Sequence, residues 1–491
     1  MSSTAPQKNK WTVMVYLAGD NNLTDECVYA LTQMKEVEGL DEAGICVVAQ
    51  FDPKGGRLKS HRYKISPASR YPLMSDDFQT WIDSSTEFRH KDYQDFTAKR
   101  VERSRNPNKR RELETNTGSP VTLFDFVTWA VEEHPAESYI LVLSGHGGGT
   151  EKGYLLRDEN PADALTMWEM QVALEAIRDA HDQLKIDILG MDSCLMTMAE
   201  VSHQLKDLAH FMVGAEGYSP IAGWPFKPVL TKMRDVLLQE TTGEDYETRK
   251  ERERREIADT IVREYVNYYV DYSIGGLSVD QASLDLSKTG VLTTAIDNLA
   301  EVLCAELARD DSQFKKDLVI AHWRAQSYNG EQFVDLYDFC QLLRDDCSSE
   351  EVRRLCQRVL DTEEAFVTSS CYSGPTYQHS HGVSIYFPWA EIDPDYADVR
   401  FGRTSKWVNF LEEYVVATRR APREAGGKFG DNSQPYAMRH TEGKHAPGKA
   451  MLPEILSMRN PPLSVGLSVC VREPGKKQGS FGKMAQTWAA E

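Results

Sequence analysis

The sequence contains no Cys-x-x-Cys pair, and its nine cysteines are scattered along the chain in an odd number. This spacing excludes a zinc ribbon and a thioredoxin-type site, and an odd count argues against a disulfide framework. No run approaches the ~18 apolar residues of a transmembrane helix, so we predict no membrane partner. Neither a G-x-G-x-x-G nor a Walker sequence occurs, which removes the usual phosphate-binding loops.

Positive charge is scarce over most of the chain. The formal charge is −19, and residues 419–491 carry 12 Lys/Arg against 6 Asp/Glu, which leaves the first 418 residues at about −25. Such a surface repels nucleic acid, so we predict no nucleic-acid partner. The polar start of the chain leads into a short strand-like stretch, 11–17, that is too short for the core of a signal peptide. We therefore expect a cytoplasmic protein.

Short apolar runs rich in β-branched and aromatic residues alternate with stretches of helical spacing. This alternation predicts an α/β fold with a mostly parallel sheet covered by helices on both faces. The expected strands are 12–17, 45–51, 139–143, 186–189, 211–213 and 383–387. The expected helices begin at residues 24, 120, 166 and 195, and a further long helix ends near residue 269.

Composition divides the chain into three parts. Residues 10–275 form the expected catalytic domain, which a charged insertion at 54–118 interrupts. Residues 276–418 are mainly helical and are expected to complete the fold. The remaining 419–491 form a basic tail, rich in Gly, Pro, Ser and Lys, that we expect to be weakly ordered.

Two of the predicted strands end in residues that can carry chemistry. Strand 139–143 leads into Ser144-Gly-His-Gly-Gly-Gly149, and strand 186–189 leads into Gly190-Met-Asp-Ser-Cys194. Functional groups of open α/β sheets collect at the carboxyl ends of strands, so His146 and Cys194 would face one crevice. A lone Cys after a buried strand is more often an inert apolar residue, but a nearby imidazole makes a thiol a nucleophile.

The residues around this pair suit acyl transfer. The backbone N–H groups of Gly147 and Cys194 are the expected donors of an oxyanion hole. A helix predicted over 195–208 would place Cys194 at its N-terminus, where the helix dipole favours a thiolate.

Three blocks of the chain resemble the clostripain family, a branch of the caspase-like cysteine peptidases. They are 11–23 (WTVMVYLAGDNNL), 141–149 (LVLSGHGGG) and 188–196 (ILGMDSCLM), and later segments at 284–288, 333–339 and 382–388 fit as well. The resemblance spans residues 10–415 and implies a caspase-like α/β/α sandwich. It also implies an endopeptidase that cuts proteins after Arg or Lys through a thioester acyl-enzyme, without a cofactor. His146 and Cys194 match the family's dyad, and Gly147 matches its oxyanion position.

Asp192 matches the acidic residue that family members use to hold a basic P1 side chain, where P1 precedes the cleaved bond. Without the resemblance, helix capping is the favoured explanation for a carboxylate two residues before Cys194. Glu216, after the strand at 211–213, is a second candidate for the same pocket. Two other functions stay open: an inactive caspase-like scaffold or signalling module, and an amidase or transamidase.

We predict no metal centre, because His379 and His381 lack a third ligand nearby. Calcium, which some relatives need, would have to use acids such as Asp52, Asp158 and Asp163. A cytoplasmic protease that cuts after basic residues could degrade many cellular proteins. We therefore expect a latent precursor (a zymogen) that self-cleavage or an activating protease converts into the active enzyme. The candidate processing sites are Lys152, Arg157 and Arg111.

Overall fold

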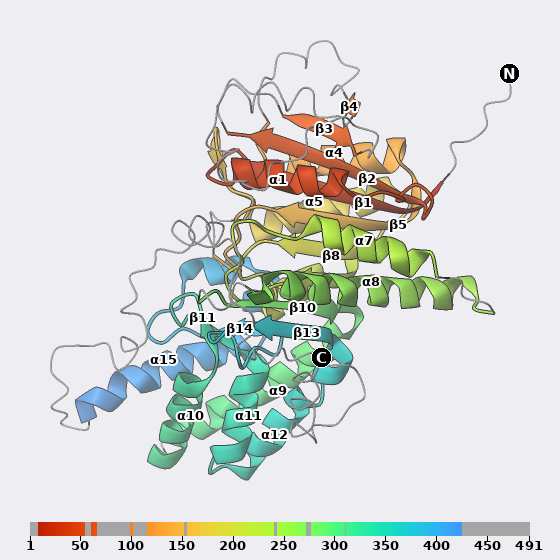
Figure 1. Cartoon of the computed structure of the whole chain (residues 1–491). Helices are drawn as coiled ribbons and strands as arrows, with labels where there is room; N and C mark the ends of the chain where they lie inside the picture. Colours follow the sequence, from red (N-terminus) through yellow and green to blue (C-terminus); the bar gives the residue numbers. More distant parts are fainter. Residues whose placement is uncertain are drawn as a thin grey trace, which may run out of the picture.

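The computed structural model describes residues 8–54, 60–65, 99–101, 115–151, 155–239, 243–271, 276–309 and 311–424. Most of the insertion 54–118 and of the tail 419–491 therefore lies outside the described residues. A central sheet carries helices on both faces, and a second group of helices lies beside one edge (Figure 1).

Nine strands of the described residues form the main sheet, in the order β13-β10-β9-β8-β5-β1-β2-β3-β4. The five strands from β9 to β2 are parallel, and those at both edges are antiparallel. The strands are β1 (Asn9–Gly19), β2 (Ile45–Pro53), β3 (His61–Lys64), β4 (Lys99–Val101), β5 (Ala136–Ser144), β8 (Ile186–Asp192), β9 (Ala209–Gly214), β10 (Val279–Asp285) and β13 (Val367–Ser373).

The central strands are apolar on both sides because each side packs against helices. In β1, Val13 and Val15 contribute to the core on one face, and Met14 and Tyr16 to the core on the other. Burying such a side chain stabilises the fold by about 1.5–3 kcal/mol. One face is covered by α1 (Thr24–Lys35), α7 (Phe226–Leu237) and α8 (Tyr246–Tyr269), and the other by α4 (Pro120–Glu133), α5 (Met167–Ala180) and α6 (Ala199–Leu205). The predicted α/β/α sandwich is confirmed.

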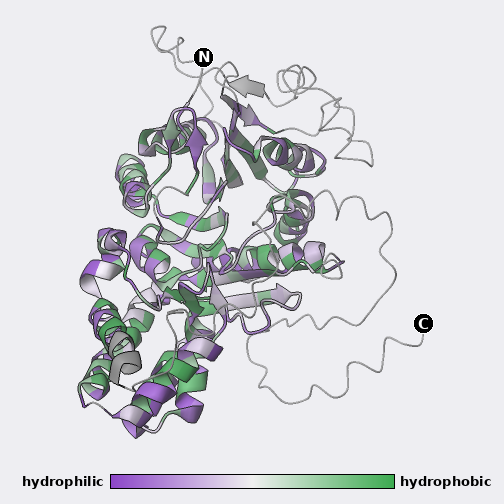
Figure 2. Cartoon of the chain, turned by 90° about the vertical axis from the view of Figure 1, so that its left-hand side faces the viewer, coloured by the Kyte–Doolittle hydropathy of each residue, from purple (hydrophilic) through white to green (hydrophobic). Residues whose placement is uncertain are grey.

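The later part of the chain adds a helical layer to this sandwich. It holds α9 (Thr289–Ala308), α10 (Ser312–Arg324), α11 (Leu336–Asp346), α12 (Glu350–Leu360) and α15 (Trp407–Glu424). A small sheet of β11 (Ser327–Tyr328), β12 (Phe333–Asp335) and β14 (Ser384–Tyr386) lies beside these helices. Hydrophobic residues follow the strands and the inward sides of the helices (Figure 2). Among the described helices, none combines the length and apolar content needed to cross a bilayer.

Three features differ from the sequence predictions. Strands β10 and β13 were not expected, because their sequences, VDQASLD and VTSSCYS, are largely polar. The strand expected at 383–387 exists as β14, but it belongs to the small sheet. The helix expected over 195–208 is only α6 (Ala199–Leu205), which changes the surroundings of Cys194.

Candidate active site

The carboxyl ends of two neighbouring central strands bring His146 and Cys194 to the same end of the sheet. Strands β5 and β8 pair in parallel, with Ser144 opposite Asp192. His146 lies two residues beyond the end of β5, and Cys194 lies two residues beyond the end of β8. Equal offsets from paired positions place the two loops side by side, as the sequence predicted.

Gly147 shows how closely the two loops pack. A Cβ atom added to Gly147 would lie 2.4 Å from the carbonyl oxygen of Cys194 and 3.0 Å from its backbone nitrogen. The first distance is shorter than any real Cβ contact, and the second is at the lower limit. Only glycine therefore fits at position 147. The Gly147 N–H donates no hydrogen bond to the described part of the chain. The Gly147 N–H, in a loop that packs against the Cys194 turn, therefore stays a candidate donor for an oxyanion hole.

His146 is half-buried and has a definite partner. Its Nε2 lies 2.8 Å from the side-chain oxygen of Asn22, in the loop after β1. Burial lowers the pKa of His146, and the nearby positive charge of Arg157 lowers it further, whereas Glu159 raises it. A lowered pKa keeps the imidazole neutral near pH 7, which is the form that can accept a proton.

Cys194 is half-buried in the turn before α6 rather than on a helix. The Ser219 N–H donates a hydrogen bond of 3.3 Å to its Sγ. Burial nevertheless raises the pKa of the Cys194 thiol to about 11, although the hydrogen bond from Ser219 lowers it. The prediction of a thiolate favoured by a helix N-terminus is wrong, because α6 begins at Ala199. The resting pair is a thiol and a neutral imidazole.

Long-range hydrogen bonds explain why the chain around Cys194 is not helical. The N–H groups of Leu195 and Met196 donate to the carbonyls of Gly217 and Ala215, at 3.0 and 2.8 Å. Leu195 also adopts a left-handed φ of 64°. These bonds hold the chain after Cys194 against the loop after β9, in a turn in which the left-handed φ of Leu195 is incompatible with an α-helix.

Asp192, the last residue of β8, lies under this turn and is only 5% exposed. Its Oδ2 accepts a 2.7 Å hydrogen bond from the Ser144 hydroxyl, whereas its Oδ1 has no hydrogen-bond partner among the described residues. Burial raises the pKa of Asp192 to about 6, and hydrogen bonds from Ser144 and the Trp224 backbone oppose this increase. Helix capping is excluded, because the residue at the N-cap of α6 is Met198.

Two tyrosines of α8, Tyr265 and Tyr269, lie near Asp192. The Tyr269 hydroxyl donates to the Gly223 carbonyl at 2.6 Å, and Tyr265 packs against Tyr269 with ring centroids 5.1 Å apart. A Cβ atom on Gly223 would lie 2.8 Å from the Asp192 carboxylate. The loop 217–224 therefore covers a carboxyl group that no Lys, Arg or His of the described residues pairs with.

Glu216 does not share this pocket, and its prediction as a second substrate contact needs correction. Its side chain is fully buried, and its Oε2 accepts a 2.6 Å hydrogen bond from the Gly382 N–H. Burial and the neighbouring Asp335 and Asp280 hold the pKa of Glu216 well above its usual range. A fully buried carboxyl group that already binds Gly382 of the C-terminal region is not placed to serve as the counter-ion of a substrate side chain.

Comparison with known proteins agrees with this geometry. A family model described as the clostripain family matches residues 15–414. The chain belongs to the clostripain family. It is a cysteine peptidase of that family, and the fold and enzyme class expected from the sequence are confirmed.

Relatives of this clostripain-family chain have been characterised or solved. Clostripain of Hathewaya histolytica is 25% identical over 426 residues, which cover 79% of this chain and 76% of the relative. A secreted cysteine protease from Bacteroides thetaiotaomicron, solved with an irreversible peptide inhibitor, has a TM-score of 0.54 at 15% identity and covers 82% of this chain and 99% of its own. An inactive zymogen from Parabacteroides distasonis has a TM-score of 0.51 at 15% identity, with coverage of 82% and 99%. These structures share the fold, and the cytoplasmic location stays a prediction.

The remaining predicted residues of this family member have mixed outcomes. Lys152 and Arg111 lie outside the described residues, and Arg157 is exposed. No group of three His, Cys, Asp or Glu within the described ranges could hold a metal ion. Asp158 accepts two hydrogen bonds from Thr117, and Asp52 accepts one from Ser60. Calcium dependence and the absence of a nucleic-acid partner stay predictions.

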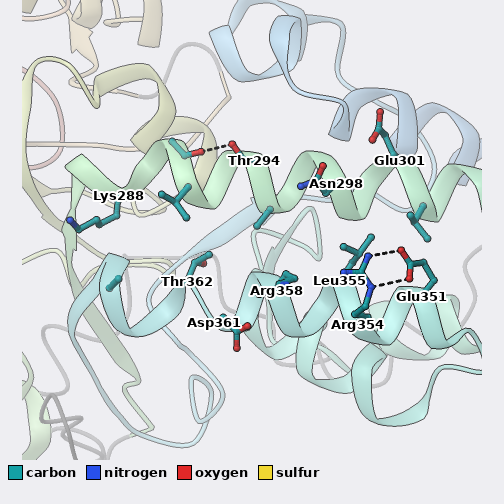
Figure 3. A pocket seen from close by; sticks show the side chains of 15 residues that line it. Lys288, Thr294, Asn298, Glu301, Glu351, Arg354, Leu355, Arg358, Asp361 and Thr362 are labelled. Carbon is teal, nitrogen blue, oxygen red and sulfur yellow. Dashed lines mark hydrogen bonds and ion pairs between the residues drawn. The ribbon is translucent and has the colours of Figure 1, made fainter.

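An open groove of about 880 Å³ lies elsewhere, between α9 and α12 (Figure 3). Its lining includes both acids and bases, and Arg354 pairs with Glu351 at 2.6 Å. None of the predicted site residues lines it. The candidate site at the strand ends is therefore separate from this groove.

Sequence reasoning missed two residues of this site. Asp280, in the unexpected strand β10, accepts hydrogen bonds from the backbone N–H groups of Glu216 and Gly217, at 2.6 and 3.0 Å. It thereby fixes the loop that binds the Cys194 turn. Asn22 lies within a block that the family resemblance covered, but nothing in its sequence context pointed to His146.

Proposed function

We propose that this chain is an endopeptidase that cuts proteins after Arg or Lys, with Cys194 as nucleophile and His146 as general base. The observation that carries the proposal is the Asp192 carboxyl group. It is buried two residues before the nucleophile, its Oδ1 has no hydrogen-bond partner among the described residues, and no described cation pairs with it. An ionised carboxylate in such a place is costly unless a ligand brings the opposite charge.

The resting protonation states support general-base catalysis. As Sγ of Cys194 attacks the substrate carbonyl carbon, the thiol proton passes to neutral His146, and the oxyanion forms next to the Gly147 and Cys194 N–H groups. The imidazolium then gives its proton to the leaving amine, and the C–N bond breaks to leave a thioester. A water molecule, deprotonated by His146, attacks the thioester and releases the acid and the free thiol.

Specificity tests this proposal directly. A peptide library cleaved by the purified protein should show Arg and Lys at P1, because only these side chains supply the cation that Asp192 lacks. An inactive scaffold would cleave nothing. A clear preference for another P1 residue, or transfer of the acyl group to an added amine instead of water, would overturn the assignment.

We further propose that the uncut chain is a latent precursor, restrained by the segment between residues 147 and 160. The Leu156 N–H donates to the His146 carbonyl at 2.9 Å, and the Asn21 side chain donates to the Arg157 carbonyl at 2.7 Å. On the other side of the candidate Lys152, Glu151 accepts a hydrogen bond of 2.9 Å from Asn329, which in turn accepts one from Tyr218. Residues 151, 156 and 157 of this segment are thus hydrogen-bonded to three loops around the site, those that contain Asn329, His146 and Asn21.

Cleavage in this segment is expected to be carried out by the enzyme itself or by a partner protease. Purified wild type should yield fragments whose new N-termini are Gly153 or Asp158, whereas Cys194→Ala should stay intact until trypsin is added. Intact mass and N-terminal sequencing distinguish these cases. If the wild type stays uncut, is fully active at once and gains nothing from limited trypsin treatment, the latent precursor does not exist.

A further inference from the structure

A third strand end reaches the candidate site. Strand β1 lies next to β5 in parallel register, with Leu17 opposite Ser144, on the side of β5 away from β8. Asn22 lies three residues beyond the end of β1, and its side-chain oxygen is 2.8 Å from Nε2 of His146. The ends of β1, β5 and β8 thus supply Asn22, His146 and Cys194 in the order in which the strands lie.

The neighbouring residue fixes the loop that carries Asn22. Asn21 is 1% exposed, and its side-chain amide donates to the carbonyls of Ala18 and Arg157, at 2.9 and 2.7 Å. Its side-chain oxygen accepts the Leu23 N–H at 2.8 Å. Three hydrogen bonds from one buried side chain hold the turn rigid, so Asn22 meets His146 from a defined direction.

The chemistry of this contact decides which imidazole nitrogen is free. An amide oxygen has lone pairs and no proton, so Nε2 must carry the hydrogen of the neutral ring and donate it. Nδ1 is then the unprotonated atom. A base needs its free lone pair on the side of the thiol, so the partner of the other nitrogen selects the reactive tautomer.

We propose that Asn22 is a positioning residue for the reaction, which holds His146 as the Nε2–H tautomer and presents Nδ1 to the Cys194 thiol. Asn22 does not touch the reacting atoms and acts through His146. The inference rests on the Cys194–His146 function proposed above. The charged groups that face His146 are Arg157 and Glu159, and Lys54 pairs with Glu159 at 2.7 Å, so Asn22 supplies a neutral acceptor between charges.

Two substitutions separate positioning from a merely structural role. Asn22→Ala should lower kcat by about 10-fold or more with little change in KM, because the ring then samples both tautomers. This loss is smaller than the ~10⁴-fold or greater loss expected for His146→Ala, which removes the base itself. Asn22→Asp keeps an acceptor and adds a negative charge, which favours the imidazolium. The acid limb of its kcat/KM profile should move to higher pH, and its kcat above that limb should exceed that of Asn22→Ala.

Asn298→Asp is the matched control, because Asn298 is exposed in the groove between α9 and α12. It should leave kcat and both limbs of the profile unchanged. Circular dichroism of each variant checks that the chain is folded. The role of Asn22 would be overturned if Asn22→Ala had the kcat of the wild type. It would also be overturned if the acid limb of Asn22→Asp lay at the same pH as that of Asn298→Asp. Activity in His146→Ala or Cys194→Ala would instead overturn the proposed function, so the two failures are distinguishable.

Discussion

Cys194→Ala should abolish peptide cleavage, and His146→Ala should reduce kcat by about 10⁴-fold or more, because the nucleophile and its base act as one unit. The raised pKa of the Cys194 thiol, about 11, makes the base essential, since almost no thiolate forms at pH 7 without it. Cleavage of a peptide with P1 Arg, followed by fluorescence, measures the loss.

The double variant supplies the control for this result. If the two residues form a dyad, Cys194→Ala with His146→Ala should be no worse than Cys194→Ala alone. Cys371→Ala, in β13, removes a buried thiol that no step uses and should retain activity. Substantial turnover by Cys194→Ala would show that another residue is the nucleophile.

Asp192→Asn should lower kcat/KM for P1 Arg peptides by about 100-fold or more, because it removes a buried partner of the substrate cation. Cleavage of peptides with a neutral P1 should change much less, and iodoacetamide should still modify Cys194. In the wild type, kcat/KM for P1 Arg should fall as the pH drops through about 6, where burial has placed the pKa of Asp192. An unchanged P1 profile in the variant would exclude this role for Asp192.

The same substitution should make the protein more stable at neutral pH. The folded-state pKa of Asp192, about 6, exceeds the unfolded value of about 3.9, so the folded state holds the proton more tightly. The bound proton therefore adds to the free energy of unfolding. This contribution is fully present below the unfolded-state pKa and is lost as the pH rises through the folded-state pKa. Asparagine avoids the buried charge, so urea unfolding should show a gain of up to ~3 kcal/mol at pH 7 and little below pH 4.

Asp259→Asn is a suitable control for both readouts. Asp259 is also a buried carboxyl group with a raised pKa, but it lies in α8 and accepts a hydrogen bond from Thr368 at 2.7 Å. Its replacement should leave the P1 preference unchanged. If both Asp192→Asn and Asp259→Asn lost cleavage after P1 Arg, the loss would reflect the removal of any buried carboxylate. It would then give no support to a P1 pocket at Asp192.

The parallel centre of the sheet followed from the sequence because its strands are buried on both faces. A run such as 139–143 has no polar position, and this pattern is typical of parallel strands between helices. Strands β10 and β13 could not be found in this way. One of their polar residues, Asp280, is paired with partners far away in the chain, the backbone N–H groups of Glu216 and Gly217, and such pairing leaves no local pattern.

The positions of His146 and Cys194 at neighbouring strand ends were predictable because glycines and strand ends mark them. The state of the thiol was not, because it depends on where α6 begins. The N–H groups of Leu195 and Met196 bind carbonyls some 20 residues later in the chain, and Leu195 adopts a left-handed φ that is incompatible with an α-helix. The burial of Glu216 against Asp335 likewise joins segments more than 100 residues apart, which the sequence alone does not relate.

Covalent trapping tests the central claim most directly. Wild type, Cys194→Ala and Asp192→Asn are each incubated with a peptide that bears a reactive P1 Arg ketone, and with versions that bear P1 Asp or Asn. Intact mass and peptide mapping then locate any adduct. We expect one adduct, on Cys194 of the wild type, with the Arg ketone reacting fastest, much slower reaction in Asp192→Asn, and none in Cys194→Ala. An adduct on another residue, or equal reaction with all three ketones, would contradict an Arg/Lys-specific peptidase built on Cys194.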